Sequence, residues 1–324
     1  MKASVYYENG GPEVFRYEDV PDPACPPDGI VIDVEVISVE GGDMINRSRV
    51  PLLSRPHIVG YQCAGTVREV GPQVKNFRVG DRVVSVVPNG AYAERVAASA
   101  ARTWAVPAGA DLVPIASVPV AFGTAHVALF ALGNLAKGEK VLVHAGAGGV
   151  GLAAIQLAKE AGAEVLTTAS SDDKLARLRE FGAAHGINYK TSSLQDAVAK
   201  AVGPRGVNLV LDSVGGKNLQ DSVGCLAYRG RIVSLGRAGR DPTLFDPYPL
   251  WAKNGSLIGL YLLSSLDHEH AQTHRAIAEC IERVARGELR VVIDKQFALA
   301  DAAKAHTYVE QRQAFGRVVL HTRG

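Results

Sequence analysis

A glycine-rich turn between a short apolar segment and a helical one dominates residues 139–174. The apolar residues 141–143 show no polar alternation, which is typical of a parallel strand that is covered on both faces. The glycine pattern G-x-G-x-x-G fills 146–151, and apolar residues with helical spacing continue from there to Gly162. A second apolar segment begins at Val165. The order of strand, turn, helix and strand predicts the first unit of a doubly wound parallel sheet.

The glycine turn also predicts a binding site. Glycines allow a sharp bend and a close approach of a pyrophosphate to the backbone, and the N–H groups and dipole at the start of the following helix attract the anion. Three glycines alone are a weak signal in a chain with 34 of them. The strand before them and the helix after them supply the context that the motif requires. We therefore predict a dinucleotide site, with a purely structural turn as the alternative.

The end of the second strand indicates which dinucleotide binds. NAD sites usually place an acidic residue there, on the ribose hydroxyls. This chain has Ser170 and Ser171, followed by two aspartates and Lys174, and small hydroxyls with a lysine suit a 2′-phosphate. Asp172 and Asp173 argue for NAD, but both also fit the first turn of the next helix, where they favour its dipole. We predict NADP(H) rather than NAD.

The distribution of strands predicts two domains. Residues 1–119 are rich in strand patterns joined by Gly and Pro turns, which indicates a compact, barrel-like β domain. Residues 120–262 alternate strands and helices, as in a doubly wound α/β domain. The stretch 263–324 carries a helical pattern at 271–287 and returns to strand character near Val318, so we expect it to complete the first domain. Strands of the second domain are predicted at 165–167, 186–189, 209–212, 231–235 and 256–260.

Composition argues against several classes of function. The chain has 324 residues, 47% hydrophobic and 21% charged, and its net charge of +2 gives no electrostatic reason to expect nucleic acid or an anionic membrane. No apolar stretch reaches the roughly 18 residues of a membrane helix. The N-terminal MKASVYYENGG has no apolar signal core, so we expect a cytoplasmic protein. Four scattered cysteines, without a CxxC pair, are expected to be free thiols rather than zinc ligands or disulfides.

Seven motifs along the chain match one enzyme family. They are GYQCAGTVREVGPQVKNFRVGDRV (60–83), GAYAE (90–94), GTA (123–125), VHAGAGGVG (143–151), INY (187–189), DSVGG (212–216) and FGRVVL (315–320). With them the chain resembles the zinc-free medium-chain dehydrogenase/reductases, in the quinone oxidoreductase (zeta-crystallin) branch, over nearly its whole length. The resemblance implies an α/β protein with a GroES-like β-barrel-type catalytic domain, 1–119 completed by 263–324, and a Rossmann NADP-binding domain, 120–262.

The resemblance also implies how the cofactor is held. The backbone of 148–150 contacts the pyrophosphate, Lys174, Tyr189 and Arg312 contact the 2′-phosphate, and Thr124 bonds the nicotinamide carboxamide. The alternative for each charged or phenolic residue is a solvated surface position, and the alternative for Thr124 is a helix cap. With the two serines, the expected cofactor-binding residues are Thr124, Gly148, Gly149, Val150, Ser170, Ser171, Lys174, Tyr189, Gly236 and Arg312.

The zinc ligands of the wider family are missing from the matching positions. These positions are Glu40, Tyr61 and Val120, and one carboxylate with a tyrosine is a poor set for Zn²⁺. We therefore expect no metal. The chain also departs from quinone oxidoreductases near the expected substrate position: Glu40 replaces an asparagine, Ile45 a tyrosine, and Gln62 an acid.

These features predict an NADPH-dependent oxidoreductase that passes hydride to a quinone or to the β-carbon of an enone. Tyr61 is the candidate proton donor or relay for an enone, with Glu40 tuning it or positioning substrate. Pocket lining is the alternative for Tyr61, and a buried carboxylate bonded to backbone or to an arginine such as Arg47 is the alternative for Glu40. An enoyl-thioester reductase, a non-catalytic NADPH-binding protein of the crystallin kind and an NADPH sensor remain competing functions, and RNA binding is unlikely. The resemblance implies a homodimer, paired through an apolar strand near 257–262.

Overall fold

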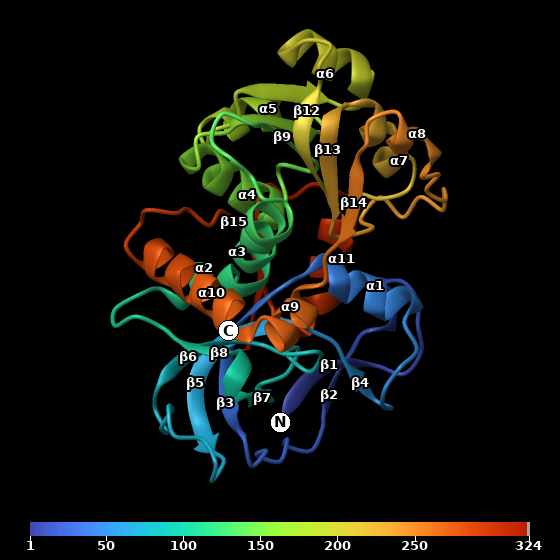
Figure 1. Cartoon of the computed structure of the whole chain (residues 1–324). Helices are drawn as coiled ribbons and strands as arrows, with labels where there is room; N and C mark the ends of the chain where they lie inside the picture. The colour runs from blue at the N-terminus through green and yellow to red at the C-terminus, as the bar shows by residue number, and fades with distance from the viewer. Residues whose placement is uncertain (323–324) are drawn as a thin grey trace. The chain divides into compact units, whose positions relative to one another are not determined.

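The structure is a computed structural model that describes residues 1–322, and these residues form two compact units. Unit 1 contains Met1–Val120 together with the chain from His270 onward, and unit 2 contains Ala121–Glu269. The two boundaries lie one and seven residues after the expected positions 119 and 262. The second shift arises because the helix α9, Leu262–His268, belongs to unit 2. Figure 1 labels the elements.

Unit 2 is built on a six-stranded sheet in which every pairing is parallel. Its strands are β9 (Lys140–Val143), β10 (Glu164–Ala169), β11 (His185–Asn188), β12 (Val207–Asp212), β13 (Leu226–Ser234) and β14 (Ser256–Gly259). Their order in the sheet is β11-β10-β9-β12-β13-β14, so the direction of winding reverses between β9 and β12. Such a reversal opens a crevice at the carboxyl ends of the two strands, where ligands bind in doubly wound sheets.

The helices of unit 2 follow the strands in the expected alternation. They are α4 (Gly149–Glu160), α5 (Asp172–Arg179), α6 (Leu194–Val202), α7 (Lys217–Gly224), α8 (Tyr248–Trp251) and α9, after the π-helical segment Val127–Leu132. α4 is buried along most of its length because small and apolar residues from Gly151 to Ala158 let it lie against the sheet. The core of this unit joins Leu142, Leu166 and Val210 from three adjacent strands.

Unit 1 is formed mainly by antiparallel strands. They are β1 (Lys2–Tyr6), β2 (Arg16–Asp19), β3 (Gly29–Ser38), β4 (His57–Ile58), β5 (Gln62–Val70), β6 (Arg82–Val86), β7 (Arg95–Ser99), β8 (Thr103–Ala105), β15 (Ile293–Ala298) and β16 (Arg317–His321). The larger sheet has the order β15-β16-β3-β5-β6-β8, with β7 also paired to β3. The pairing of β16 with β3 places the described part of the C-terminal stretch in unit 1.

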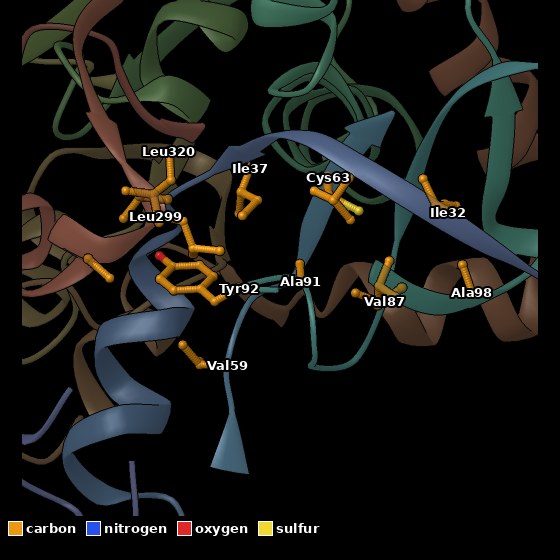
Figure 2. Close-up of a cluster of buried hydrophobic side chains, with 14 of the residues drawn as sticks. Ile32, Ile37, Val59, Cys63, Val87, Ala91, Tyr92, Ala98, Leu299 and Leu320 are labelled. Atoms are coloured by element: carbon orange, nitrogen blue, oxygen red, sulfur yellow. The ribbon is translucent and has the colours of Figure 1, made fainter. Parts of the chain in front are cut away.

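Unit 1 also contains helices, of which α1 and α11 contribute residues to one buried cluster. The helices are α1 (Gly41–Arg49), α2 (Leu112–Ile115), α10 (His270–Ala285) and α11 (Ala302–Glu310); α3 (Val118–His126) crosses the boundary to unit 2, and short 3-10 turns occur at Pro12–Val14, Ala100–Arg102 and Leu299–Asp301. Figure 2 shows Tyr92 in this cluster together with Ile37, Val59 and Leu299. The Tyr92 ring is fully buried, so its hydroxyl needs a partner inside the protein.

None of the helices in residues 1–322 combines the length and the apolar run that a segment crossing a bilayer would need. The four cysteines are free thiols, as expected.

Candidate functional site

The glycine turn lies where the sequence predicts it, between β9 and α4 at the reversal point of the sheet. A Cβ atom on Gly146 would lie 2.0 Å from Oγ1 of Thr167, and a Cβ atom on Gly151 would lie 2.5 Å from the carbonyl oxygen of Ala145. These two glycines are therefore required by the packing of the turn against β10 and against itself.

Gly148 is less constrained, because a Cβ atom there would make one tight contact with the backbone and overlap no other atom. Its φ is −83°, which any residue adopts, and the nearest atom to a Cβ would be the Ala145 carbonyl oxygen at 3.3 Å. The fold itself gives little reason for a glycine at this position. The lack of a side chain would instead allow a ligand to approach the backbone closely. Gly148 is also the N-cap of α4, and the Leu152 N–H donates to the Gly148 carbonyl at 2.9 Å. The N–H groups of Gly149 and Val150 precede Leu152 and have no acceptor within the helix, so they suit a pyrophosphate.

The residues expected at the 2′-phosphate converge on neighbouring strand ends. Ala169 of β10 is paired with Asn188 of β11 in parallel register, so Ser170 and Tyr189 are the next residues on adjacent strands. The Tyr189 N–H donates to the Ala169 carbonyl at 3.3 Å, and the phenol is 43% exposed. Lys174 lies in the first turn of α5, and its N–H donates to the Ser171 hydroxyl at 3.3 Å.

Ser171 is thus the N-cap of α5, and the two aspartates after it lie in the first helical turn, as predicted. Oδ1 of Asp172 accepts a hydrogen bond from the Asn188 amide at 3.0 Å. An NAD site needs its acid at the end of β10, on the ribose. Because Asp172 and Asp173 belong to the start of a helix, they do not supply that acid from the strand end, which supports the prediction of NADP(H).

Two further expected residues also lie in unit 2. Gly236 follows β13, and its neighbour Leu235 donates its N–H to the carbonyl of Asp212 at the end of β12, at 2.9 Å. This places Gly236 at the carboxyl edge of the sheet with the glycine turn. Thr124 is the seventh of nine residues in α3 and is 6% exposed. The helix-cap alternative for Thr124 is therefore wrong.

Arg312 belongs to unit 1 and follows α11, in a left-handed conformation with φ +58°. It is exposed. Its contact with the 2′-phosphate stays a prediction.

Glu40 forms the centre of a buried polar cluster in unit 1. Its carboxylate accepts hydrogen bonds from Ser38 at 3.1 Å and from the Gln62 amide at 2.5 Å, and it forms an ion pair with Arg317 of β16. Burial raises the pKa of the Glu40 carboxyl, and the Arg317 guanidinium opposes that rise. Arg47 was the example of an arginine partner for Glu40, and this example is wrong, because Arg47 bonds to His306 and pairs with Glu310.

Gln62 connects this cluster to the segment that begins α3. Its amide oxygen accepts the N–H of Val120 at 3.0 Å while its amide nitrogen donates to Glu40. Glu40 and Val120, two of the positions that match zinc ligands, are therefore bridged by an amide. Within residues 1–322, no group of three or more His, Cys, Asp and Glu side chains is arranged to hold a metal ion.

Tyr61, the third of those positions, lies against the start of α1. A Cβ atom on Gly42 would lie 2.2 Å from the Tyr61 ring, so only a glycine at this position leaves space for the ring. The Asn46 amide, one turn further along α1, donates to the Tyr61 hydroxyl oxygen at 3.2 Å. Asn46 is a functional candidate that the sequence did not reveal.

A second buried chain of hydrogen bonds runs behind α1. Arg47 donates to Nδ1 of His306 at 2.8 Å, and Nε2 of His306 lies 2.9 Å from the Tyr92 hydroxyl, which donates to Oδ2 of Asp43 at 3.1 Å. Since Arg47 can only donate, the imidazole carries its proton on Nε2. Burial, together with Arg47, lowers the pKa of His306 to about 3. Arg47 also pairs with Glu310 at 2.7 Å.

Two family models match the chain, one mainly in unit 1 and one mainly in unit 2. Residues 26–108 match the family model described as an alcohol dehydrogenase GroES-like domain, and residues 149–281 match the model described as a zinc-binding dehydrogenase. The chain is 32% identical to a 2-haloacrylate reductase from a Burkholderia species, over 99% of this chain and 98% of the relative. It is also 32% identical to the quinone oxidoreductase of Sus scrofa, over 99% and 97% of the two chains.

The crystal structure of the Escherichia coli quinone oxidoreductase complexed with NADPH is similar throughout. It has a TM-score of 0.94 and 29% sequence identity, and the match covers 99% of this chain and all of that one. The fold, the glycine turn and the full-length similarity agree, and the chain belongs to the quinone oxidoreductase family of zinc-free medium-chain dehydrogenase/reductases.

Proposed function

We propose that this protein is an NADPH-dependent oxidoreductase that reduces a quinone or an α,β-unsaturated carbonyl compound without zinc. The observation that carries the proposal is Gly148 at the reversal point of the sheet, where a residue without a side chain begins α4 beside N–H groups that have no acceptor within the helix. The relatives named quinone oxidoreductase and 2-haloacrylate reductase support the two acceptor classes, since both names denote reduction of an electron-poor compound.

The residues of unit 2 fit a phosphorylated dinucleotide. The N–H groups of Gly149 and Val150 would hold the pyrophosphate, and Lys174 and Tyr189 would hold the 2′-phosphate beside the serines that follow β10. Lysine and phenol donors suit a phosphate dianion better than a ribose hydroxyl pair. Bound NADPH supplies the hydride, and the protein's contribution is to orient and to exclude water.

A role for zinc is not supported by the residues of unit 1. A Lewis-acid mechanism needs a metal held by three protein ligands with one open position. Glu40 is instead neutralised by the Arg317 guanidinium and bridged to Val120 through Gln62. We therefore assign Glu40 a positioning role in this polar cluster, and a metal-free protein is expected to be fully active.

Tyr61 is the proton donor for an enone substrate. Addition of hydride to the β-carbon leaves an enolate, which needs a proton at its α-carbon. The Asn46 amide can only donate to the Tyr61 oxygen, so it stabilises that oxygen as the phenol gives up its proton. A reduced quinone takes up its protons on its oxygen atoms, and these protons can come directly from solvent. Quinone reduction therefore does not require Tyr61.

The test compares Tyr61→Phe with the wild type on 1,4-naphthoquinone, 2-cyclohexenone and crotonyl-CoA, with NADPH oxidation followed at 340 nm. We expect kcat for the enone and the thioester to fall by about 100-fold or more, as for loss of a general acid, and turnover of the quinone to persist. Tyr7→Phe is the matched control, since Tyr7 is an exposed phenol bonded to Glu18. Unchanged enone turnover in Tyr61→Phe would remove the assigned role, and failure of the wild type to oxidise NADPH with any acceptor would contradict the proposed activity.

The protein is further proposed to form a homodimer through the edge of the unit 2 sheet. β14 is the last strand of the sheet, and large side chains near it are exposed, including Trp251 at 72%, Tyr248 at 66% and Tyr261 at 59%. An exposed strand edge flanked by aromatic residues suits pairing with a second copy across a two-fold axis.

A further inference from the structure

The strongest unassigned feature of unit 2 is a buried histidine next to the glycine turn. His144 follows β9 directly and is 2% exposed. Its Nδ1 lies 3.2 Å from the Thr168 hydroxyl of β10, and its Nε2 lies 2.9 Å from the Ser222 hydroxyl of α7. His144 lies within the VHAGAGGVG motif of the glycine turn.

The neighbours of His144 determine which nitrogen carries the proton. The Ser222 hydroxyl donates its hydrogen to the carbonyl of Asn218 at 2.7 Å, so it can only accept from the imidazole, and Nε2 must be the protonated nitrogen. Burial lowers the pKa of His144 to about 3, so the ring is neutral and Nδ1 is bare. Nδ1 therefore accepts the hydroxyl hydrogen of Thr168.

The same chain continues into the glycine turn. The Thr168 oxygen, with its hydrogen given to His144, accepts the N–H of Ala145 at 3.1 Å, and the Thr168 carbonyl accepts the N–H of Gly146 at 2.9 Å. Each hydroxyl and each ring nitrogen in this series of hydrogen bonds is then assigned as a donor, an acceptor or both. At its far end the Asn218 amide donates to Asp212, the last residue of the neighbouring strand β12.

Ala145 is the residue in this turn that needs such support. Its φ is +51°, a left-handed conformation that costs a non-glycine residue about 1 kcal/mol. Its carbonyl accepts the Gly148 N–H at 2.9 Å and lies beside Gly151, so a relaxed Ala145 would shift the start of α4.

We propose that His144 is a positioning residue for the cofactor: as a fixed Nε2–H tautomer it orients Thr168, which holds Ala145 and thereby the N–H groups that bind the pyrophosphate. This inference rests on the proposed NADPH site. It deepens that site by naming two residues that do not touch the cofactor and yet set its affinity.

Binding measurements on Thr168 variants test the hydrogen bonds that connect His144 to Ala145. Thr168→Val removes the hydroxyl and keeps the shape, while Thr168→Ser keeps the hydroxyl. We expect the dissociation constants of NADPH and of ADP, measured by calorimetry, to rise about fivefold to twentyfold in Thr168→Val, as for one or two lost hydrogen bonds. Thr168→Ser is expected to stay close to the wild type. Binding of adenosine 2′-monophosphate, which has no pyrophosphate, is expected to change by less than a factor of about two.

Two controls separate positioning from general damage. Ser85→Ala removes a buried hydroxyl pair with Thr103 in unit 1, so it should lower the melting temperature and leave NADPH affinity unchanged. ¹⁵N chemical shifts of His144 in the wild type should show one protonated nitrogen, Nε2, that does not titrate between pH 5 and pH 8, and this measurement needs no variant to fold.

The outcomes distinguish the two claims. A titrating His144, equal NADPH affinity in Thr168→Val, or an equal loss for all three ligands would overturn the inference alone, provided that the wild type binds NADPH. A wild type that does not bind NADPH would overturn the proposed function and the inference with it.

Discussion

Individual residues at the carboxyl edge of the unit 2 sheet divide into those that the fold requires and those that it does not. Gly146 and Gly151 are fixed by steric contact with Thr167 and Ala145, so they would be glycines with or without a ligand. Gly148 and Tyr189 have no comparable steric reason, since a Cβ atom on Gly148 would make only one tight contact and the Tyr189 phenol is 43% exposed. Ligand binding explains the second group best.

Replacement of Lys174 by alanine tests the 2′-phosphate contact. A charge-assisted hydrogen bond to phosphate contributes about 1.5–3 kcal/mol, so we expect the NADPH dissociation constant to rise about 10-fold to 100-fold. NADH has no 2′-phosphate, and its affinity should be unchanged. Lys200→Ala, which removes an exposed lysine of α6 in the same unit, is the control. Equal losses for NADPH and NADH would contradict the contact.

These residues could be predicted from the sequence because they lie within short stretches whose order of strand, turn and helix is local. The Glu40 cluster could not be found in that way. Arg317 is 277 residues from Glu40, and only the pairing of β16 with β3 brings the two together. The nearby Arg47 was the natural choice from sequence, but it lies on the His306 side of α1.

At the scale of elements, α1 organises the candidate acceptor side of unit 1. Glu40 and Asp43 form a capping box at its start, Asn46 reaches Tyr61, and Arg47 reaches His306. The sequence did not predict this helix, because two glycines at its start and a low content of apolar residues obscured the helical pattern. By contrast, the strands of unit 2 were predicted well, since buried parallel strands are continuous apolar runs.

Asp43 should give the stability of this helix an unusual pH dependence. Its Oδ2 accepts from the Glu40 N–H and from Tyr92, but Oδ1 is buried without a partner. Burial raises the pKa of Asp43 from 3.8 to about 8, with the Glu40 charge adding to the rise and Arg317 opposing it. Because the folded-state pKa is the higher one, the stabilisation is complete below pH 4 and is lost as pH rises towards and through about 8.

We therefore expect Asp43→Asn, which mimics the protonated acid, to remove this dependence. Between pH 5 and pH 8, the free energy of unfolding of the wild type should fall relative to Asp43→Asn, by up to about 1.4 kcal/mol per pH unit. Urea unfolding at four pH values measures the difference. Parallel stability curves for the two proteins would show that Asp43 is ionised throughout.

At the scale of the whole molecule, the chain divides into two units near residue 120, where the apolar periodicity of the sequence changes. The last part of the chain returns to unit 1 through β15 and β16. The oligomeric state is harder to predict from the sequence, because a dimer interface is an exposed surface and has no strong sequence pattern.

Replacement of Trp251 by aspartate tests the proposed dimer. A charge at a side chain that is 72% exposed beside β14 should leave the fold intact and shift the protein from dimer to monomer in light scattering. Val79→Asp is the control, because Val79 is an equally exposed apolar residue of unit 1 at 66%. A wild type that is monomeric at micromolar concentration, or a dimer that Trp251→Asp leaves unchanged, would contradict this interface.

The central claim is hydride transfer from NADPH to an organic acceptor with no metal taking part. It is tested most directly by turnover of protein dialysed against a chelator, with the zinc content measured by mass spectrometry on the same sample. The structure predicts full NADPH oxidation with a quinone or an enone at less than about one zinc per hundred chains, because Arg317 neutralises Glu40 where a metal would need it. Activity that disappears with the metal and returns when zinc is added would contradict it.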